Sequence, residues 1–221
     1  MNKQQVMQLI EQEKLVVIVR GVAKEKLIPL CGALYRGGVR LLEITFDARG
    51  NTPWEETAQS IAMLDKHFEG RICIGAGTVL NTAQAELAVH AGAKYLISPN
   101  VSPAVIAYAK EAGVVSMPGA MTPTEIVDAY NAGADFVKVF PADSMGLSYV
   151  KAVRAPLSHI PMIAVGGVDE KNVGDFLAIG LSGVGVGSNI VKKAMLDAED
   201  YDGIAKLAGL YTEAIKRACN I

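Results

Sequence analysis

A single lysine, Lys138, lies in the middle of the run GADFVKVFPA, which otherwise has the composition of a buried β-strand. Side chains alternate along a strand, so Lys138 shares a face with Phe136 and Phe140, and the two valines occupy the other face. Burial lowers the pKa of a lysine towards neutrality, and the resulting free amine attacks a ketone to form a Schiff base. The alternative is a lysine that reaches out to water, as we expect for Lys94 in AKYLIS.

A second run, VRLLEITF, contains one carboxylate, Glu43, at an alternating position with Leu41 and Thr45. If that face points to the same interior as Lys138, Glu43 can carry a proton to and from the carbon beside an imine. It can equally form a structural ion pair with the lysine. Both interpretations predict that Glu43 and Lys138 lie near one another.

Two further side chains follow predicted strands directly. Arg20 ends LVVIVRG, where its planar guanidinium suits a carboxylate held by two hydrogen bonds, although a solvated arginine at a strand end is the alternative. Thr78 follows a strand in GAGTV, and the glycines beside it allow a ligand to approach closely.

Two glycine-rich loops near the end of the chain, VGGV and GVGVGSN, have the composition of a phosphate site. In barrels that bind phosphate, the anion commonly lies between the last two strand–helix loops, against backbone N–H groups. Gly166, Gly167, Gly187 and Ser188 fit that role. The rival interpretation, a dinucleotide fingerprint, requires G-x-G-x-x-G followed by a βαβ unit, and neither is present.

Short runs rich in Val, Ile and Leu alternate with Ala-rich helical stretches after an opening amphipathic helix. The predicted strands are 15–19, 39–46, 71–76, 93–98, 114–118, 134–140, 161–167 and 182–187. This α/β pattern predicts a (β/α)8 TIM barrel with an extra N-terminal helix, forming one domain over residues 1–221. A doubly wound open sheet is the alternative, but it would leave two strand edges that no second domain covers. In a barrel, the chemistry is expected at the C-terminal ends of the strands.

The composition narrows the class of partner. The net charge is -2 with no Lys/Arg-rich run, so we expect a small-molecule partner and no nucleic acid or membrane surface. The three cysteines form no C-x-x-C pair, which predicts neither a disulfide framework nor a zinc site. Because no apolar run approaches the roughly 20 residues that span a bilayer, a cytoplasmic location is expected.

With these residues identified, the chain resembles the 2-keto-3-deoxy-6-phosphogluconate (KDPG) and 4-hydroxy-2-oxoglutarate (KHG) aldolase family over residues 13–192. The matching phrases occur in order: EIT, GAGTVL, ISPN, MPGAMTPTE, VKVFPA, GGV and GVGS. One such phrase would be weak, but the ordered set is specific.

The resemblance implies a class I aldolase, usually a homotrimer, that needs no metal or other cofactor. Lys138 would form the imine, and Glu43 would act as general acid and base while the C3–C4 bond breaks to give pyruvate and glyceraldehyde 3-phosphate. By the same resemblance, Arg20 and Thr78 would hold the pyruvyl carboxylate, and Pro99 and Phe140 would pack around the bound pyruvyl group. The phosphate would be bound by Gly166, Gly167, Gly187 and Ser188.

Two departures from the gluconate-type pattern concern the substrate. Many such members carry an arginine where this chain has Asp47, and they have T-G-G where this chain has Val165 before the glycine pair. Val165 and Arg20 together resemble the aldolases that act on the galactonate epimer. Activity on that epimer or on 4-hydroxy-2-oxoglutarate is therefore an alternative to the gluconate substrate.

Two other classes share some of these features. A phosphate-binding isomerase or synthase barrel would use the glycine loops without an imine, and it would tolerate Lys138→Arg. A non-catalytic sugar-phosphate binding protein would bind the ligand without releasing pyruvate.

Overall fold

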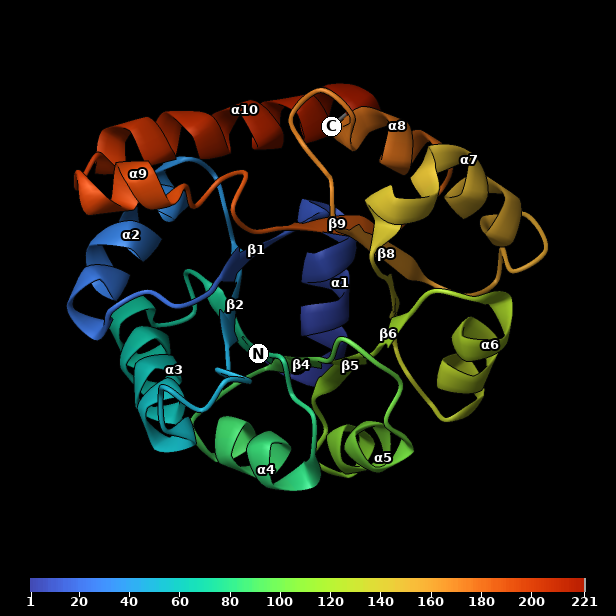
Figure 1. The fold of residues 1–221 in the computed structure, drawn as a ribbon, viewed down its shortest axis with the longest axis horizontal. Coiled ribbons are helices and arrows are strands. Elements are labelled where there is room, and N and C mark those ends of the chain that lie inside the picture. Colours follow the sequence, from blue (N-terminus) through green and yellow to red (C-terminus); the bar gives the residue numbers. More distant parts are fainter. Residues whose placement is uncertain (221) are drawn as a thin grey trace.

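Parallel strands form a ring at the centre of the computed structural model, which describes residues 1–220, and helices surround the ring (Figure 1). The strands are β1 Leu15–Val19, β2 Leu41–Thr45, β3 Cys73–Gly77, β4 Tyr95–Ile97, β5 Val115–Met117, β6 Gly119–Ala120, β7 Val137–Val139, β8 Met162–Val165 and β9 Gly183–Val186. The helices are α1 Lys3–Glu13, α2 Lys24–Arg36, α3 Trp54–Phe68, α4 Thr82–His90, α5 Pro103–Glu111, α6 Pro123–Asn131, α7 Ala142–Arg154, α8 Val173–Ala178, α9 Lys193–Asp197 and α10 Tyr201–Cys219. The strand order is β5-β4-β3-β2-β1-β9-β8-β7-β6.

The ring closes through one interrupted strand. β5 and β6 stand at the two ends of the strand order, yet only Pro118 separates them in the chain. Pro118 has no N–H, but its carbonyl accepts a hydrogen bond from the Lys138 N–H at 2.9 Å, so pairing with β7 continues across the break. The (β/α)8 barrel prediction is confirmed. The predicted fifth strand, 114–118, ends too early, because its second half continues to Ala120.

The predicted N-terminal helix is α1, which closes the amino end of the barrel. Lys3 forms an ion pair with Asp135, just before β7, at 2.9 Å, and the carbonyl of Lys14 accepts a hydrogen bond from the Val184 N–H in β9 at 2.8 Å. Val6 and Ile10 of α1 are buried among residues of the barrel interior. The opposite, carboxyl end of the strands is therefore the end available for a ligand (Figure 1).

Strand alternation divides the apolar core into an outer and an inner cluster. The outer cluster packs the strands against the helices and includes Val137 and Val139. The inner cluster fills the barrel and includes Leu41, Tyr95 and Phe136. Leu41 and Phe136 lie on the faces that the sequence assigned to the interior, so Glu43 and Lys138, two residues further along, also point into the barrel.

Local sequence explains where the outer helices begin and end. Thr122 caps α6 with a reciprocal capping box to Glu125, followed by proline in the first turn. Glycines with positive φ end the turns after α4 and α6, at Gly92 and Gly133, where the left-handed backbone favours glycine. Among the residues described, no helix combines the length and the apolar character needed to cross a membrane.

Candidate active site

Lys138 is the central strand residue of β7, with its ammonium group inside the barrel. The residue is 6% exposed, and its neighbours in register are Gly119 in β6 and Ile163 in β8. Nζ lies 4.5 Å from the centroid of the Phe140 ring. Burial lowers the pKa of Lys138; the negative charge of Glu43 opposes this effect, and the positive charge of Arg20 adds to it. The structure thus places an amine with a lowered pKa at the carboxyl end of the barrel.

Glu43 points into the same interior from β2 and is 2% exposed. Its carboxyl group lies over Gly77 of β3, where any Cβ would overlap with Glu43 Oε1 and Cδ. Glycine at this position therefore provides the space that the carboxyl group occupies. Burial raises the pKa of Glu43, and the positive charges of Lys138 and then Arg20 oppose the rise.

The two groups influence each other without direct ion-pair contact within residues 1–220. Each raises the charged population of the other, while burial favours the neutral form of both. A buried amine and a buried carboxyl group whose environments shift their pKa values towards neutrality have the properties that acid–base chemistry on a bound imine requires.

Arg20 and Thr78 meet across the barrel mouth, as their positions after β1 and β3 predict. Arg20 Nη2 donates a hydrogen bond to Thr78 Oγ1 at 3.0 Å. Thr78 has φ 57, which is unusual for a β-branched residue. Such strain is often found at ligand sites, because the surrounding structure must hold the residue in place. Here the next residue, Val79, donates to the Ile97 carbonyl at 3.1 Å and fixes the turn on β4.

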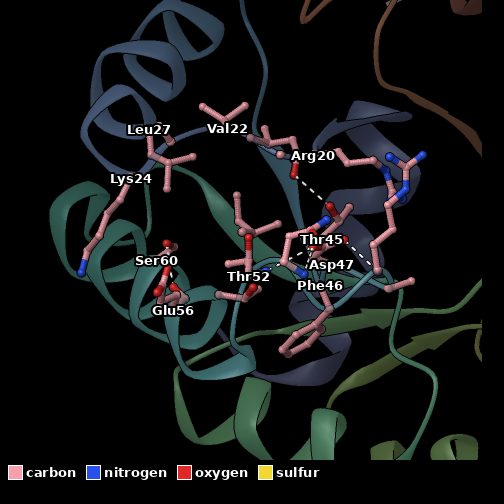
Figure 2. Close-up of a pocket in the computed structure, with 18 residues that line it drawn as sticks. Arg20, Val22, Lys24, Leu27, Thr45, Phe46, Asp47, Thr52, Glu56 and Ser60 are labelled. Carbon is pink, nitrogen blue, oxygen red and sulfur yellow. Dashed lines mark hydrogen bonds between the residues drawn. The ribbon is translucent and has the colours of Figure 1, made fainter.

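A cavity of about 680 Å3 lies between the β1–α2 and β2–α3 loops, and Figure 2 shows its polar side chains. Arg20 lines it, but Glu43 and Lys138 do not. The cavity is therefore a neighbour of the barrel mouth rather than the lysine site itself, with Arg20 between the two. Its other polar lining residues include Lys24, Thr45, Asp47, Thr52, Glu56 and Ser60.

Asp47 follows β2, and its carboxylate folds back onto its own loop (Figure 2). It accepts hydrogen bonds from the N–H groups of Arg49 at 2.9 Å, Asn51 at 2.8 Å and Thr52 at 3.2 Å. The bond from Arg49 is the main reason why the pKa of Asp47 is lowered. Asp47 thus shapes the β2–α3 loop, and Arg20, Lys24 and Arg49 are the basic side chains that line the cavity.

Pro99 and Phe140 border the lysine from two sides. The Phe140 ring stands beside Nζ of Lys138. Pro99 packs its backbone on Gly119, the residue of β6 that is in register with Lys138. Both are half-buried, so each presents apolar surface at the mouth.

The two glycine loops lie side by side after the neighbouring strands β8 and β9. Asn189 Nδ2 donates to the Val168 carbonyl at 2.8 Å and ties the loops together. Gly166 and Gly167 have φ 105 and φ 67, and a Cβ on Gly167 would overlap with the side chain of Asp143. Glycine at these two positions therefore also has a structural explanation, because the start of α7 packs closely against them.

The sequence analysis did not identify the glycines against which the interior side chains pack. Gly75 and Gly77 alternate on the inner face of β3, where Gly75 lies under the Tyr95 ring and Gly77 under Glu43. The signal was present, because CIGAG places two glycines on the face that adjoins a predicted interior carboxylate. Asp143, which packs on Gly167, also had no signal in its surface-like sequence context.

Comparisons with known proteins identify the family of the chain. A sequence model of the family described as KDPG and KHG aldolase matches residues 6–207. A probable 2-dehydro-3-deoxy-6-phosphogalactonate aldolase of Rhizobium meliloti (strain 1021) is 41% identical over 185 residues, which are 83% of this chain and 84% of that protein.

Two solved structures share the fold and most of both chains. One, described as a native KDPGal structure, has a TM-score of 0.83 and 31% identity over 94% of this chain and 96% of its own. The other is the KDPG aldolase from Legionella pneumophila with pyruvate captured as a covalent carbinolamine intermediate. It has a TM-score of 0.82 and 25% identity over 92% of this chain and 96% of its own. The chain therefore belongs to the family of KDPG and KHG aldolases, enzymes that make and break carbon–carbon bonds.

Proposed function

We propose that this aldolase cleaves a 6-phosphorylated 2-keto-3-deoxy sugar acid through a Schiff base on Lys138, with Glu43 as the proton carrier. The observation that carries the proposal is the shared burial of these two side chains at the carboxyl end of one barrel, 6% and 2% exposed. The Legionella pneumophila relative, whose structure holds pyruvate as a covalent carbinolamine, supports the same chemistry.

The proposed cycle balances without an added electron carrier. The Lys138 amine attacks the C2 ketone, and loss of water gives an iminium ion. The Glu43 carboxylate accepts the proton of the C4 hydroxyl as the C3–C4 bond breaks, which releases C4–C6 as glyceraldehyde 3-phosphate and leaves the bonding electrons in an enamine on Lys138. Glu43 then returns the proton to C3, and hydrolysis of the resulting iminium releases pyruvate and restores the amine.

The raised pKa of Glu43 and the lowered pKa of Lys138 suit this cycle. A carboxyl group whose pKa lies closer to neutrality gives up and takes back a proton at lower cost. A lysine whose burial favours the neutral amine is a nucleophile without a separate base to deprotonate it.

The other residues of the mouth fit the two ends of the substrate. Arg20 is a cation hydrogen-bonded to Thr78, and we assign this pair to the keto acid's carboxylate. The apolar surfaces of Pro99 and Phe140 flank the pyruvyl carbons. The paired loops that carry Gly166, Gly167, Gly187 and Ser188 take the phosphate through their backbone N–H groups.

For the sugar acid we propose the galactonate epimer, with the gluconate epimer as a slower substrate. The 41% identical Rhizobium meliloti relative is named for the galactonate compound. Val165 also places a methyl group, rather than a hydroxyl, over Gly185 in the interior, 2.8 Å from where a Cβ on Gly185 would be. We further propose a cytoplasmic homotrimer built from one domain per chain.

Pyruvate release measured with coupled lactate dehydrogenase tests this assignment. The galactonate epimer, the gluconate epimer and 4-hydroxy-2-oxoglutarate are compared side by side, and the proposal predicts the largest kcat/KM for the first. Lys138→Met abolishes release, whereas the matched variant Lys94→Met, which removes a lysine that pairs with Asp65, retains it. Turnover that survives in Lys138→Met contradicts the Schiff-base function, and a largest kcat/KM for either other substrate contradicts the epimer.

A further inference from the structure

Ile18, the fourth residue of β1, points into the barrel and has no role in the chemistry above. It lies on the same face as Val16 and packs against the inner cluster. Unlike its neighbours Val17 and Val19, which are buried, Ile18 stays partly exposed. Because ligands of such barrels bind at the carboxyl ends of the strands, this apolar surface is available to touch a substrate.

β1 lies between β2, which carries the proposed proton carrier, and β9, which leads into a glycine loop (Figure 1). On one side, Ile18 is in register with Glu43 of β2. On the other side, a Cβ atom on Gly187 would lie 3.5 Å from Cβ of Ile18. Ile18 therefore stands between the Glu43 carboxyl group and the loop that we assign to the phosphate.

The face of β9 that points into the barrel carries Gly183, Gly185 and Gly187, none of which has a side chain. Two branched apolar residues flank this face. At Gly185, a Cβ atom would lie 2.8 Å from Cγ2 of Val165 in β8 and 3.7 Å from Cδ1 of Ile18. Gly185 is buried beneath them, whereas Gly187 stays partly exposed. A ligand that lies along Gly187 therefore also contacts Ile18.

The proposed cycle holds both ends of the part of the substrate that becomes the aldehyde. C2 is bonded to Lys138, the C4 hydroxyl reaches Glu43, and the phosphate on C6 reaches the loop of Gly187. β2 and β9 are separated by two strand spacings, about 10 Å. The carbons from C4 to C6 must therefore run from β2 towards β9 and cross β1 at Ile18.

We propose that Ile18 is a specificity-determining residue that limits the length of the aldehyde half of the substrate. This inference rests on the proposed function, which places C4 at Glu43 and the phosphate at the glycine loops. Because both ends of the aldehyde half are held, an additional carbon has to bulge towards β1, where the Ile18 side chain occupies the space. A short aldehyde without a phosphate, such as glyoxylate, does not extend to β9 and depends less on Ile18.

The test is the aldol addition of pyruvate to glyoxylate, glyceraldehyde 3-phosphate and erythrose 4-phosphate, whose chains have two, three and four carbons. All three aldehydes react with the same pyruvyl enamine on Lys138, so ratios of kcat/KM remove effects on the imine. Ile18→Ala is expected to raise the ratio of erythrose 4-phosphate to glyceraldehyde 3-phosphate about tenfold. Ile18→Phe is expected to lower the ratio of glyceraldehyde 3-phosphate to glyoxylate about tenfold.

The matched controls are Ile28→Ala and Ile28→Phe, which alter a partly buried isoleucine of α2 that packs on the outer cluster, and both ratios should stay at their wild-type values. Thermal unfolding establishes which variants are folded at the assay temperature, and Ile18→Ala decides alone if Ile18→Phe is not. Wild-type ratios in Ile18→Ala, while borohydride still traps pyruvate on Lys138, overturn the role of Ile18 alone. The absence of a Lys138 adduct in the wild type overturns the proposed function and this inference with it.

Discussion

The carboxyl group of Glu43 lies directly over the backbone of Gly77, so that a methyl group on Gly77 would overlap with Oε1, Cδ and Cγ of the glutamate. The carboxyl group from β2 therefore packs against the backbone of β3. Because the strand has no side chain at this position, Glu43 reaches the carboxyl end of the barrel without displacing the core below it. The position of the proton carrier therefore depends on a residue that has no chemistry of its own.

Gly77→Ala is predicted to lower kcat about a hundredfold, because it displaces the Glu43 carboxyl group by about an ångström or more. The control is Gly32→Ala in α2, where a Cβ meets nothing within 4 Å, and this variant should gain about 0.5–1 kcal/mol in free energy of unfolding without a change in kcat. Steady-state kinetics and urea unfolding of both variants check the prediction. A Gly77→Ala enzyme with the wild-type kcat would show that the placement of Glu43 is not critical.

The buried amine makes the free energy of unfolding depend on pH in a known direction. Burial lowers the pKa of Lys138 below its value of 10.5, so the unfolded chain binds the proton more strongly than the folded protein. The penalty is complete below the folded pKa and disappears as pH rises through the window from that pKa to 10.5. The stability of the wild type relative to Lys138→Met should therefore increase from neutral to alkaline pH, by about 1.4 kcal/mol for each unit by which the pKa is lowered.

Urea unfolding at a series of pH values measures this difference, and the subtraction of the two curves removes the groups that both proteins share. A difference that is constant from neutral to alkaline pH would mean that Lys138 titrates alike in the folded and unfolded chains. That result would contradict the account of the lysine as a desolvated amine.

Arg20 and Thr78 are predicted to act as one carboxylate clamp. Arg20→Ala should raise the KM for the keto acid about tenfold to a hundredfold with a smaller effect on kcat, because it removes charged hydrogen bonds. Thr78→Val should raise KM less, and the double variant should show less than the product of the two effects, since Arg20 and Thr78 share a hydrogen bond of 3.0 Å. Arg36→Ala, which removes an exposed arginine paired with Asp202, is the control. Strictly multiplicative effects would argue against a shared clamp.

Val165 is predicted to set the ratio between the two epimers. Val165→Thr replaces a methyl group by a hydroxyl of similar size, and one added hydrogen bond should raise the gluconate-to-galactonate ratio of kcat/KM about twofold to tenfold. Val165→Ala is the control, because it removes the methyl groups without adding a hydroxyl. An equal change of the ratio in both variants would assign the effect to space rather than to hydrogen bonding.

The fold was predictable because its local signals agree with one another. Glycines at the ends of helices, such as Gly92 and Gly133, and alternation within the strands, such as that around Lys138, all indicate the same repeating unit. The interruption at Pro118 was not predictable, because the residues on both sides are compatible with a strand and only the pairing with β7 shows that Ala120 still belongs to it.

The placement of the candidate residues in the barrel was predictable from the sequence, but their contacts were not. Period-two alternation is a property of one strand, so it places Glu43 and Lys138 inside the barrel. Other features depend on neighbouring strands and turns. They are the packing of side chains over Gly75 and Gly77, the strained φ of Thr78 and the contact of Asp143 with Gly167. A local pattern such as CIGAG indicates free space on one face of a strand, but which side chain fills that space depends on the register between segments far apart in the sequence.

The central claim is that the Lys138 amine forms a covalent imine with a keto acid inside the barrel, and borohydride reduction in the presence of pyruvate tests it most directly. Peptide mass spectrometry is expected to find the reduced pyruvyl adduct on Lys138, in the wild type and in Lys94→Met, and no adduct in Lys138→Met. An adduct on Lys94 with Lys138 unmodified would contradict the claim.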